Sequence, residues 1–555
     1  MDFGRQPCGE GQGRGRGDEG ESGSRDRRQH PLRRHRPHLA PSQWNRRQPA
    51  DAGPRPAIPR PPPPAARRRR HRPLSTTRPT QSSGPPGDGR ADRVGCCRHG
   101  RLEDRGRVDR GVRRTGALRR TPVAAAPGDL AGRLDDLLGA LPGPPAAWGA
   151  LVWDIDAARV VYARDERRLF VPASNQKLVT TAAALLRWGG GHRFPTVVCG
   201  PPPAPDGTVA GDLYLKGFGD PTLARAAYQR RELHLRGATV EEIARRLWRA
   251  GVRRVEGDLV ADDSWFDAER RVAGWRPSLA AECGALGALT VDGARAGERP
   301  VADPALHAGR ALLAALRRRG VAVTGAVRRG LTPAGLPVLA TVRSAPLAAI
   351  LRRMDKDSDN FVAEILLKGL GKDAVGLGST AAGAAVCRAA LRECGLAPGE
   401  AFVADGSGLS SDNRLSPLGL VRLLVALRQR PDFRVTWQAL AVAGRDGTVR
   451  DRLRDTAAAG NAHVKTGTLA DSVCLSGYVR SANGHRLAFA IMVNGEALPI
   501  ASVEATLDGA VAALAGADLP GPLRLAAWPG LRQVPVSASG LVHPRGGELQ
   551  PCVQP

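Results

Sequence analysis

Near residue 125 the chain changes from a segment that cannot build a hydrophobic core to one that can. Residues 1–120 hold 30 Arg, no Lys and 12 acidic residues, a net charge of +18, and they show no apolar periodicity. They also contain the runs Pro61–Pro64 and Arg67–Arg70. Such a composition buries too little apolar surface to offset the entropy of the chain. We therefore predict that residues 1–125 are a disordered Arg/Pro/Gly-rich segment and that folding begins after it.

Composition and charge exclude several classes of protein. The chain carries a net charge of +28. An Arg-rich arm can bind nucleic acid or an anionic surface, but we favour a solvated tail and expect no nucleic-acid partner. No apolar run approaches the roughly 18 residues of a transmembrane segment, and no apolar stretch typical of a signal peptide lies near the N-terminus. The nine cysteines include no C-x-x-C pair, which argues against a zinc site.

Apolar residues after residue 126 recur with helical or strand spacing. The helical pattern predicts helices at 129–141, 172–188, 240–250, 304–319 and 500–515, and a helix-rich stretch over 347–370 and 380–394. The strand pattern predicts strands at 151–155, 160–162, 212–216, 257–260, 321–327, 464–468, 474–480 and 486–493. Cys387 and Cys394 are seven residues apart on one predicted helix, where we expect them to pack in the core.

The first motif with chemical meaning is a serine three residues before a lysine. Ser174 and Lys177 lie at the start of a predicted helix, where positions i and i+3 share a face, so the amine can reach the hydroxyl. The helix N-terminus also offers free backbone N–H groups. A nearby base and donors for an oxyanion are what a serine nucleophile needs. Alone, this short motif is weak, and a capping serine beside a surface lysine explains it equally well.

The second motif, Lys465–Thr468 with the sequence K-T-G-T, follows Val464 and forms part of a predicted strand. Glycine at an exposed strand edge lets a substrate lie against the backbone as an added strand. The lysine supplies fixed positive charge and the two threonine hydroxyls suit a carboxylate. A polar edge strand with a solvated lysine is the alternative.

The third motif, S-x-N, has three candidates. Ser358–Asn360 precedes an apolar helical run, Ser411–Asn413 lies in a Gly/Ser-rich loop, and Ser481–Asn483 lies in a tight turn. Turn geometry alone explains the last one. We favour Ser358, because it would cap a helix that can bury against the core and hold the polar pair still.

The motifs S-x-x-K, S-x-N and K-T-G in this order are far more specific together than singly. With further segments, they resemble the DacB-type D-alanyl-D-alanine carboxypeptidase/endopeptidases, the class C low-molecular-mass penicillin-binding proteins. The resemblance covers about residues 128–518. It is carried by the segments Pro172–Leu178, Gly219–Leu223, Gly257–Leu259, Asp263–Phe266, Lys356–Asn360, Asp405–Ser410 and Lys465–Thr468.

This resemblance implies a mixed α/β (α+β) fold of the penicillin-binding-protein and serine β-lactamase type. Its antiparallel sheet is flanked by helices and interrupted by an inserted α/β domain. We expect the transpeptidase-like domain in two parts, 126–197 and 337–520, around an insert at 198–336. The Pro/Gly-rich residues 521–555 would form a loose C-terminal tail.

The same resemblance implies acyl transfer on peptidoglycan stem peptides ending in D-Ala-D-Ala, outside the cytoplasm, with β-lactams as covalent inhibitors. Ser174 would be the nucleophile, Lys177 its base and Ser358 a proton relay. Lys465 and the helix N-terminus would lower the pKa of Lys177. No metal or cofactor is needed. The substrate-binding residues would be Asn360, Lys465, Thr466, Gly467 and Thr468.

Two other functions remain open at this point. One is a β-lactamase of the same fold, although no motif places a glutamate to activate a deacylating water. The other is a non-catalytic scaffold that binds peptidoglycan, which the intact Ser174, Lys177 and Lys465 disfavour. Carboxypeptidase and endopeptidase activity are not distinguished by any motif.

Overall fold

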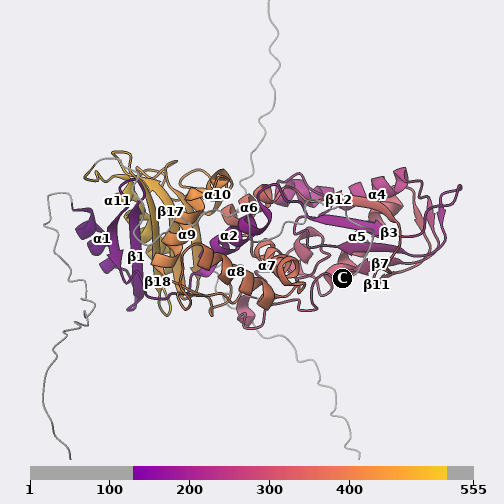
Figure 1. Ribbon diagram of the computed structural model, residues 1–555, viewed down its shortest axis with the longest axis horizontal. Helices are drawn as coiled ribbons and strands as arrows, with labels where there is room; N and C mark the ends of the chain where they lie inside the picture. The colour runs from indigo at the N-terminus through magenta and orange to yellow at the C-terminus, as the bar shows by residue number, and fades with distance from the viewer. Residues whose placement is uncertain (1–128, 280, 522–555) are drawn as a thin grey trace, which may run out of the picture. The chain divides into compact units, whose positions relative to one another are not determined.

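The computed structural model describes residues 129–279 and 281–521 (Figure 1). The disordered segment predicted at 1–125 lies outside these residues, and so does the tail predicted at 521–555 apart from its first residue. The described part contains two main sheets with helices packed on them, so the mixed α/β fold expected from the resemblance is confirmed.

The larger sheet joins the beginning and the end of the described chain. Its six strands are antiparallel and follow the order β15-β16-β17-β18-β1-β2. Their bounds are Ala441–Val442 (β15), His463–Leu469 (β16), Ser472–Arg480 (β17), Arg486–Asn494 (β18), Ala147–Asp154 (β1) and Arg159–Arg164 (β2). The predicted hairpin at 151–162 and the three predicted C-terminal strands are therefore confirmed.

Helices cover both faces of this sheet. On one face α1 (Leu130–Gly139) packs against α11 (Ile500–Ala515), and the two share a hydrophobic cluster with β1, β17 and β18. The other face carries a larger cluster, which the remaining helices of this region supply. They are α2 (Gln176–Trp188), α6 (Leu347–Lys356), α7 (Asn360–Val375), α8 (Thr380–Glu393), α9 (Pro417–Gln429) and α10 (Phe433–Ala439).

Two of these helices, α9 and α10, were not predicted from the apolar spacing of the sequence. Nine of the thirteen residues of α9 are buried, so its exposed face is narrow and its amphipathic period is weak. Its start is nevertheless marked, because Pro417 occupies the first turn and the Ser416 side chain accepts a hydrogen bond from Gly419 N at 3.0 Å.

The smaller sheet lies between α2 and α6 in the sequence. It has the order β11-β7-β5-β3-β12, with bounds Val327–Arg329, Leu259–Asp262, Leu213–Gly217, Pro195–Cys199 and Val338–Arg343. Its hydrophobic cluster includes residues of α4 (Val240–Arg249) and α5 (Pro304–Arg318). The sheet spans residues 195–343, and the domain limits 198–336 stay a prediction.

The strand predicted at 321–327 is wrong as a single element. Its ends form β10 (Ala322–Val323) and β11, which belong to different sheets. Between them, Gly325 lies against the Gly257 carbonyl, where an added Cβ would be only 2.4 Å from the oxygen. This close approach, which only glycine allows, is where the chain leaves one sheet for the other.

The remaining elements are short. The strand β10 forms a three-stranded parallel sheet with β6 (Arg254–Val255) and β4 (Thr208–Val209). Two ribbons and a short helix are also present: β8 (Arg295–Ala296) with β9 (Arg299–Pro300), β13 (Ala401–Phe402) with β14 (Arg414–Leu415), and α3 (Ala226–Tyr228).

No single helix in the described ranges is both long and apolar enough to span a membrane. By length and composition alone, α7 and α8 meet the criterion only as a pair bent by 81°.

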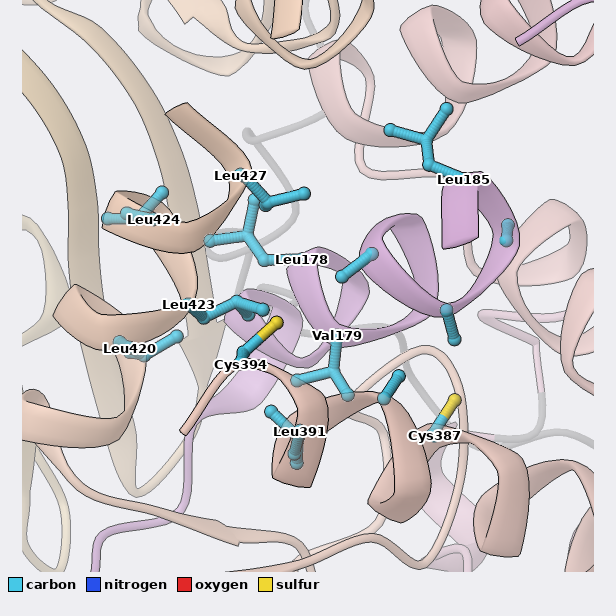
Figure 2. Close-up of a cluster of buried hydrophobic side chains, with 14 of the residues drawn as sticks. Leu178, Val179, Leu185, Cys387, Leu391, Cys394, Leu420, Leu423, Leu424 and Leu427 are labelled. Carbon is cyan, nitrogen blue, oxygen red and sulfur yellow. The ribbon is translucent and has the colours of Figure 1, made fainter. Parts of the chain in front are cut away.

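Helix α2, which carries the S-x-x-K lysine, is packed between α8 and α9. Figure 2 shows Leu178 facing the leucines of α9, and Val179 beside Leu391 of α8 and Cys394, which directly follows α8. Cys387 and Cys394 are both buried in this cluster, so their predicted core role is confirmed. Every residue of α2 from Gln176 to Leu185 is buried, and a helix held this tightly fixes the positions of the side chains at its start.

Candidate active site

The structure brings Ser174 and Lys177 into direct contact. Ser174 lies in a 3-10 turn, η1 (Ala173–Asn175), that leads into α2. Ala173 before it has a positive φ of 46°, a strained conformation that aims the next residue away from the regular helix path. Lys177 is completely buried, and its Nζ lies 2.8 Å from Ser174 Oγ.

Two further acceptors surround the Lys177 amine. Its Nζ donates to Asn360 Oδ1 and to the Ser407 backbone carbonyl, each at 2.7 Å. An ammonium uses its three protons on Ser174, Asn360 and Ser407. A neutral amine has two protons, and when these go to the two carbonyl-type oxygens its lone pair faces Ser174 Oγ. This is the arrangement that a general base requires.

Burial is the main reason why the pKa of Lys177 falls, and it falls to about 8. Where they are ionised, the carboxyl groups of Asp405, Glu364, Asp359 and Asp355 act in the opposite direction. The sequence-based prediction that Lys465 and the helix N-terminus lower the pKa of Lys177 is therefore wrong. Removal from water lowers it, and the repulsion between the two amines lowers the pKa of Lys465 instead. A lysine with a pKa near 8 has a usable neutral fraction at physiological pH.

The favoured S-x-N motif lies at the same place. Ser358 Oγ accepts a hydrogen bond from Lys465 Nζ at 3.1 Å, and Asn360 contacts Lys177 as described above. Ser358 does not cap the helix as predicted. Asp359 caps α7 by accepting from Val362 N at 3.1 Å, and Ser358 precedes it with a φ of +57°. Ser358 and Asp359 are adjacent in the sequence. Because the chain turns through a left-handed conformation at Ser358, the helix begins one residue later and Asp359 caps it.

Strand β16 supplies the K-T-G-T motif. Lys465 is completely buried, and both burial and the neighbouring Lys177 lower its pKa. Beyond Val464, the outer edge of β16 has no strand partner among the described residues, since β15 pairs only with His463 and Val464. An added Cβ at Gly467 would lie 2.8 Å from the Pro172 carbonyl and 3.0 Å from Ser174 N. Glycine therefore lets β16 approach the serine turn.

The two threonines of β16 are already hydrogen bonded. Thr466 Oγ1 donates to Thr448 Oγ1 at 2.8 Å. Thr468 Oγ1 donates to Glu504 Oε1 of α11 at 3.0 Å. Thr466 is buried and Thr468 is exposed. Because each hydroxyl already donates its proton, both must exchange partners before they donate to a substrate carboxylate.

The two other S-x-N candidates have structural roles. Asn413 is buried in the loop after β13, where Nδ2 donates to Asp405 Oδ1 at 2.8 Å. Ser481 Oγ donates to Asn483 Oδ1 at 2.8 Å within the β17–β18 turn, as turn geometry predicts. Neither motif contacts Lys177 or Lys465.

Several groups that hold the site were not identified from the sequence. The Ser407 carbonyl contacts Lys177, and the Glu364 carboxylate accepts hydrogen bonds from the backbone next to it. Asn360 Nδ2 donates to the Glu282 carbonyl at 3.1 Å, which turns Asn360 Oδ1 towards the lysine. The available signal was Glu364 itself, a charged residue within the apolar run Phe361–Leu367 and four residues after Asn360.

Comparison with known proteins places this geometry in a family. The model of the D-Ala-D-Ala carboxypeptidase 3 (S13) family matches residues 130–283 and 285–514. The chain belongs to this family. It is therefore a peptidase-family enzyme, and the match includes the S-x-x-K, S-x-N and K-T-G motifs.

Relatives and solved structures agree with the family assignment. A D-alanyl-D-alanine carboxypeptidase of Actinomadura sp. (strain R39) is 32% identical over 438 residues, which cover 64% of this chain and 79% of that protein. Carboxypeptidase DacB of Mycolicibacterium smegmatis is 32% identical over 359 residues, covering 62% and 75%. The crystal structure of penicillin binding protein 4 from Haemophilus influenzae has a TM-score of 0.60 and 22% identity, covering 68% of this chain and 98% of that one. The chain thus has the penicillin-binding-protein fold.

Proposed function

We propose that this chain is a serine-type D-Ala-D-Ala carboxypeptidase/endopeptidase that works through an acyl-enzyme on Ser174. Its substrates would be peptidoglycan stem peptides ending in D-Ala-D-Ala, which places its work outside the cytoplasm, and penicillins would acylate the same serine. The observation that carries the proposal is the buried amine of Lys177, 2.8 Å from Ser174 Oγ, with two other acceptors for its protons.

Acylation begins with the neutral form of Lys177. The amine removes the Ser174 proton as Oγ attacks the carbonyl of the penultimate D-alanine. The backbone N–H groups of Ser174 and Thr468 would stabilise the oxyanion, and the short approach of β16 to the serine turn supports this pairing. Ser358, hydrogen bonded to Lys465, would pass a proton to the leaving amine. Water then hydrolyses the acyl-enzyme and releases the shortened peptide.

Substrate recognition would use the free edge of β16. An extended peptide can add to this edge as a strand, with Asn360 on its acyl side. Thr466 and Thr468 would bind the terminal carboxylate, and the positive charge of Lys465 would support them. A free carboxylate is the feature that separates a carboxypeptidase substrate from an internal peptide bond.

A fluorescent penicillin tests the proposal. The native protein should form a covalent adduct that mass spectrometry locates on Ser174, and it should release D-alanine from a peptide ending in D-Ala-D-Ala. Ser174→Ala should abolish both reactions, since the nucleophile of such a unit carries nearly all of the covalent catalysis. Ser411→Ala is the matched control and should leave both unchanged. A native protein without an adduct would favour the scaffold hypothesis.

The lifetime of the adduct separates the peptidase from a β-lactamase of the same fold. We expect an adduct that survives for minutes or longer. Rapid release of hydrolysed penicillin with many turnovers would instead assign the chain to the lactamases.

A further inference from the structure

Asn360 Oδ1 and the Ser407 carbonyl oxygen accept the two protons of the neutral Lys177 amine and so direct its lone pair. Different groups hold each of these oxygens in position. Asn360 Oδ1 is turned towards the lysine by the Glu282 carbonyl, which binds the other end of the amide. The second oxygen, the Ser407 carbonyl, belongs to a loop. A loop carbonyl acts as a precise acceptor only when the backbone around it is fixed. Asp405 Oδ1 holds the peptide group of this carbonyl by accepting from Gly408 N at 2.8 Å.

Two other buried side chains fix the backbone that immediately precedes this carbonyl. Glu364 Oε1 accepts hydrogen bonds from Gly406 N at 3.1 Å and from Ser407 N at 2.7 Å. Thr180 Oγ1 donates to the Gly406 carbonyl at 2.8 Å. Both side chains are completely buried. Three of the polar groups that define the 406–407 backbone are therefore held by α7 and α2, the helices that also carry Asn360 and Lys177.

We infer that Glu364 and Thr180 are positioning residues for the reaction at Ser174. Neither touches the reacting atoms. They hold the Gly406–Ser407 backbone so that the Ser407 carbonyl takes one proton of Lys177 and the lone pair of the neutral amine faces Ser174 Oγ. This inference rests on the proposed function of Ser174 and Lys177 and adds the support that makes the base effective.

The essential property of Glu364 in this role is its acceptor oxygen and not its charge. Burial raises the pKa of Glu364, which favours the protonated carboxyl. The carbonyl oxygen of a protonated carboxyl still accepts two N–H groups, and the amide oxygen of glutamine does the same. Methionine has a similar length and volume but leaves two buried N–H groups without an acceptor.

The experiment compares Glu364→Gln with Glu364→Met in the full-length chain. The acylation rate constant and the apparent binding constant for a fluorescent penicillin are measured separately. We expect Glu364→Gln to stay within about threefold of the native rate constant. We expect Glu364→Met to lose about 100-fold, the size that follows a misplacement of roughly 1 Å, with little change in the binding constant.

A matched variant removes the effect of lost stability. Asp154 in β1 is also completely buried, and its Oδ1 accepts two backbone N–H groups, from Asp156 and Ala157, each at 3.0 Å. Its Oδ2 also contacts His485 Nδ1 at 2.8 Å, so its loss destabilises the fold at least as much. Strands β17 and β18 separate β1 from β16. Asp154→Leu should lower the melting temperature as Glu364→Met does but leave the acylation rate constant unchanged.

Three results would overturn the inference. They are a Glu364→Met protein that acylates at the native rate, a loss carried by the binding constant alone, and a Glu364→Gln protein as slow as Glu364→Met. If Glu364→Met does not fold, Thr180→Val decides, because valine keeps the shape of threonine without its hydroxyl. About tenfold slower acylation supports the inference and an unchanged rate refutes it. A native protein that forms no adduct would instead refute the proposed function.

Discussion

Gly408 is the residue whose replacement tests the geometry of the nucleophile most directly. It has a φ of +86°, and an added Cβ would lie 1.8 Å from the Ala173 carbonyl oxygen. Real Cβ contacts do not fall below 3.0 Å, so in Gly408→Ala the two segments must separate by about 1.2 Å. Ala173 directly precedes Ser174, so the shift reaches the nucleophile. A displacement of about 1 Å costs on the order of 100-fold in rate.

Gly399→Ala is the control for this experiment. It carries the cost of the backbone conformation without the close contact. The φ of Gly399 is also +86°, but an added Cβ would meet nothing within 4 Å. Each alanine variant should lose roughly 1–2 kcal/mol from the left-handed conformation. Only Gly408→Ala should also label about 100-fold more slowly with a fluorescent penicillin. Equal labelling rates for Gly408→Ala and Gly399→Ala would refute the reasoning, and melting curves of both proteins check that each is folded.

Three further predictions follow from the site and the core. The neutral form of Lys177 is the active one and its pKa is about 8, so the acylation rate should rise with pH up to about 8 and then level off; rapid-mixing labelling across this range measures it, and a flat profile contradicts it. Asn360→Asp places a carboxylate beside the amine, which favours the ammonium, so the rising limb should move to higher pH in the same assay. Leu178→Ala removes a completely buried side chain and should cost about 2–5 kcal/mol of stability in a denaturant titration; an unchanged midpoint would contradict the packing of α2.

Local spacing predicts the part of the site that lies within one helical turn. Ser174 and Lys177 are three residues apart, and the expected contact between the amine and the hydroxyl is present. The same holds for most helices and strands, whose apolar periods reflect one buried face. Helix α9 is not recognised in the sequence because most of its surface is buried. Its apolar residues therefore show only a weak helical period.

Contacts between distant segments are a different problem. Lys465 and Ser358 are 107 residues apart, and the Ser407 carbonyl is 230 residues from Lys177. Backbone carbonyls have no sequence signature, so the role of Ser407 could not be predicted from its residue type. The pKa of Lys177 also depends on burial, which arises from packing that brings α2, α7 and the 405–413 loop together. The reacting groups can therefore be predicted from the sequence more fully than the groups that hold them in position.

The segment between β7 and β8 links the smaller sheet to the site. Trp275 Nε1 donates to Asp405 Oδ2 at 2.9 Å, and the Glu282 carbonyl orients Asn360. Aromatic and aliphatic side chains of this segment share one hydrophobic cluster with Phe361 and Leu409. Asp405 in turn accepts hydrogen bonds from the backbone that follows Ser407. Both oxygens that direct Lys177 are thus held partly by residues between the S-x-x-K and S-x-N motifs, which gives this segment a role in the geometry of the base.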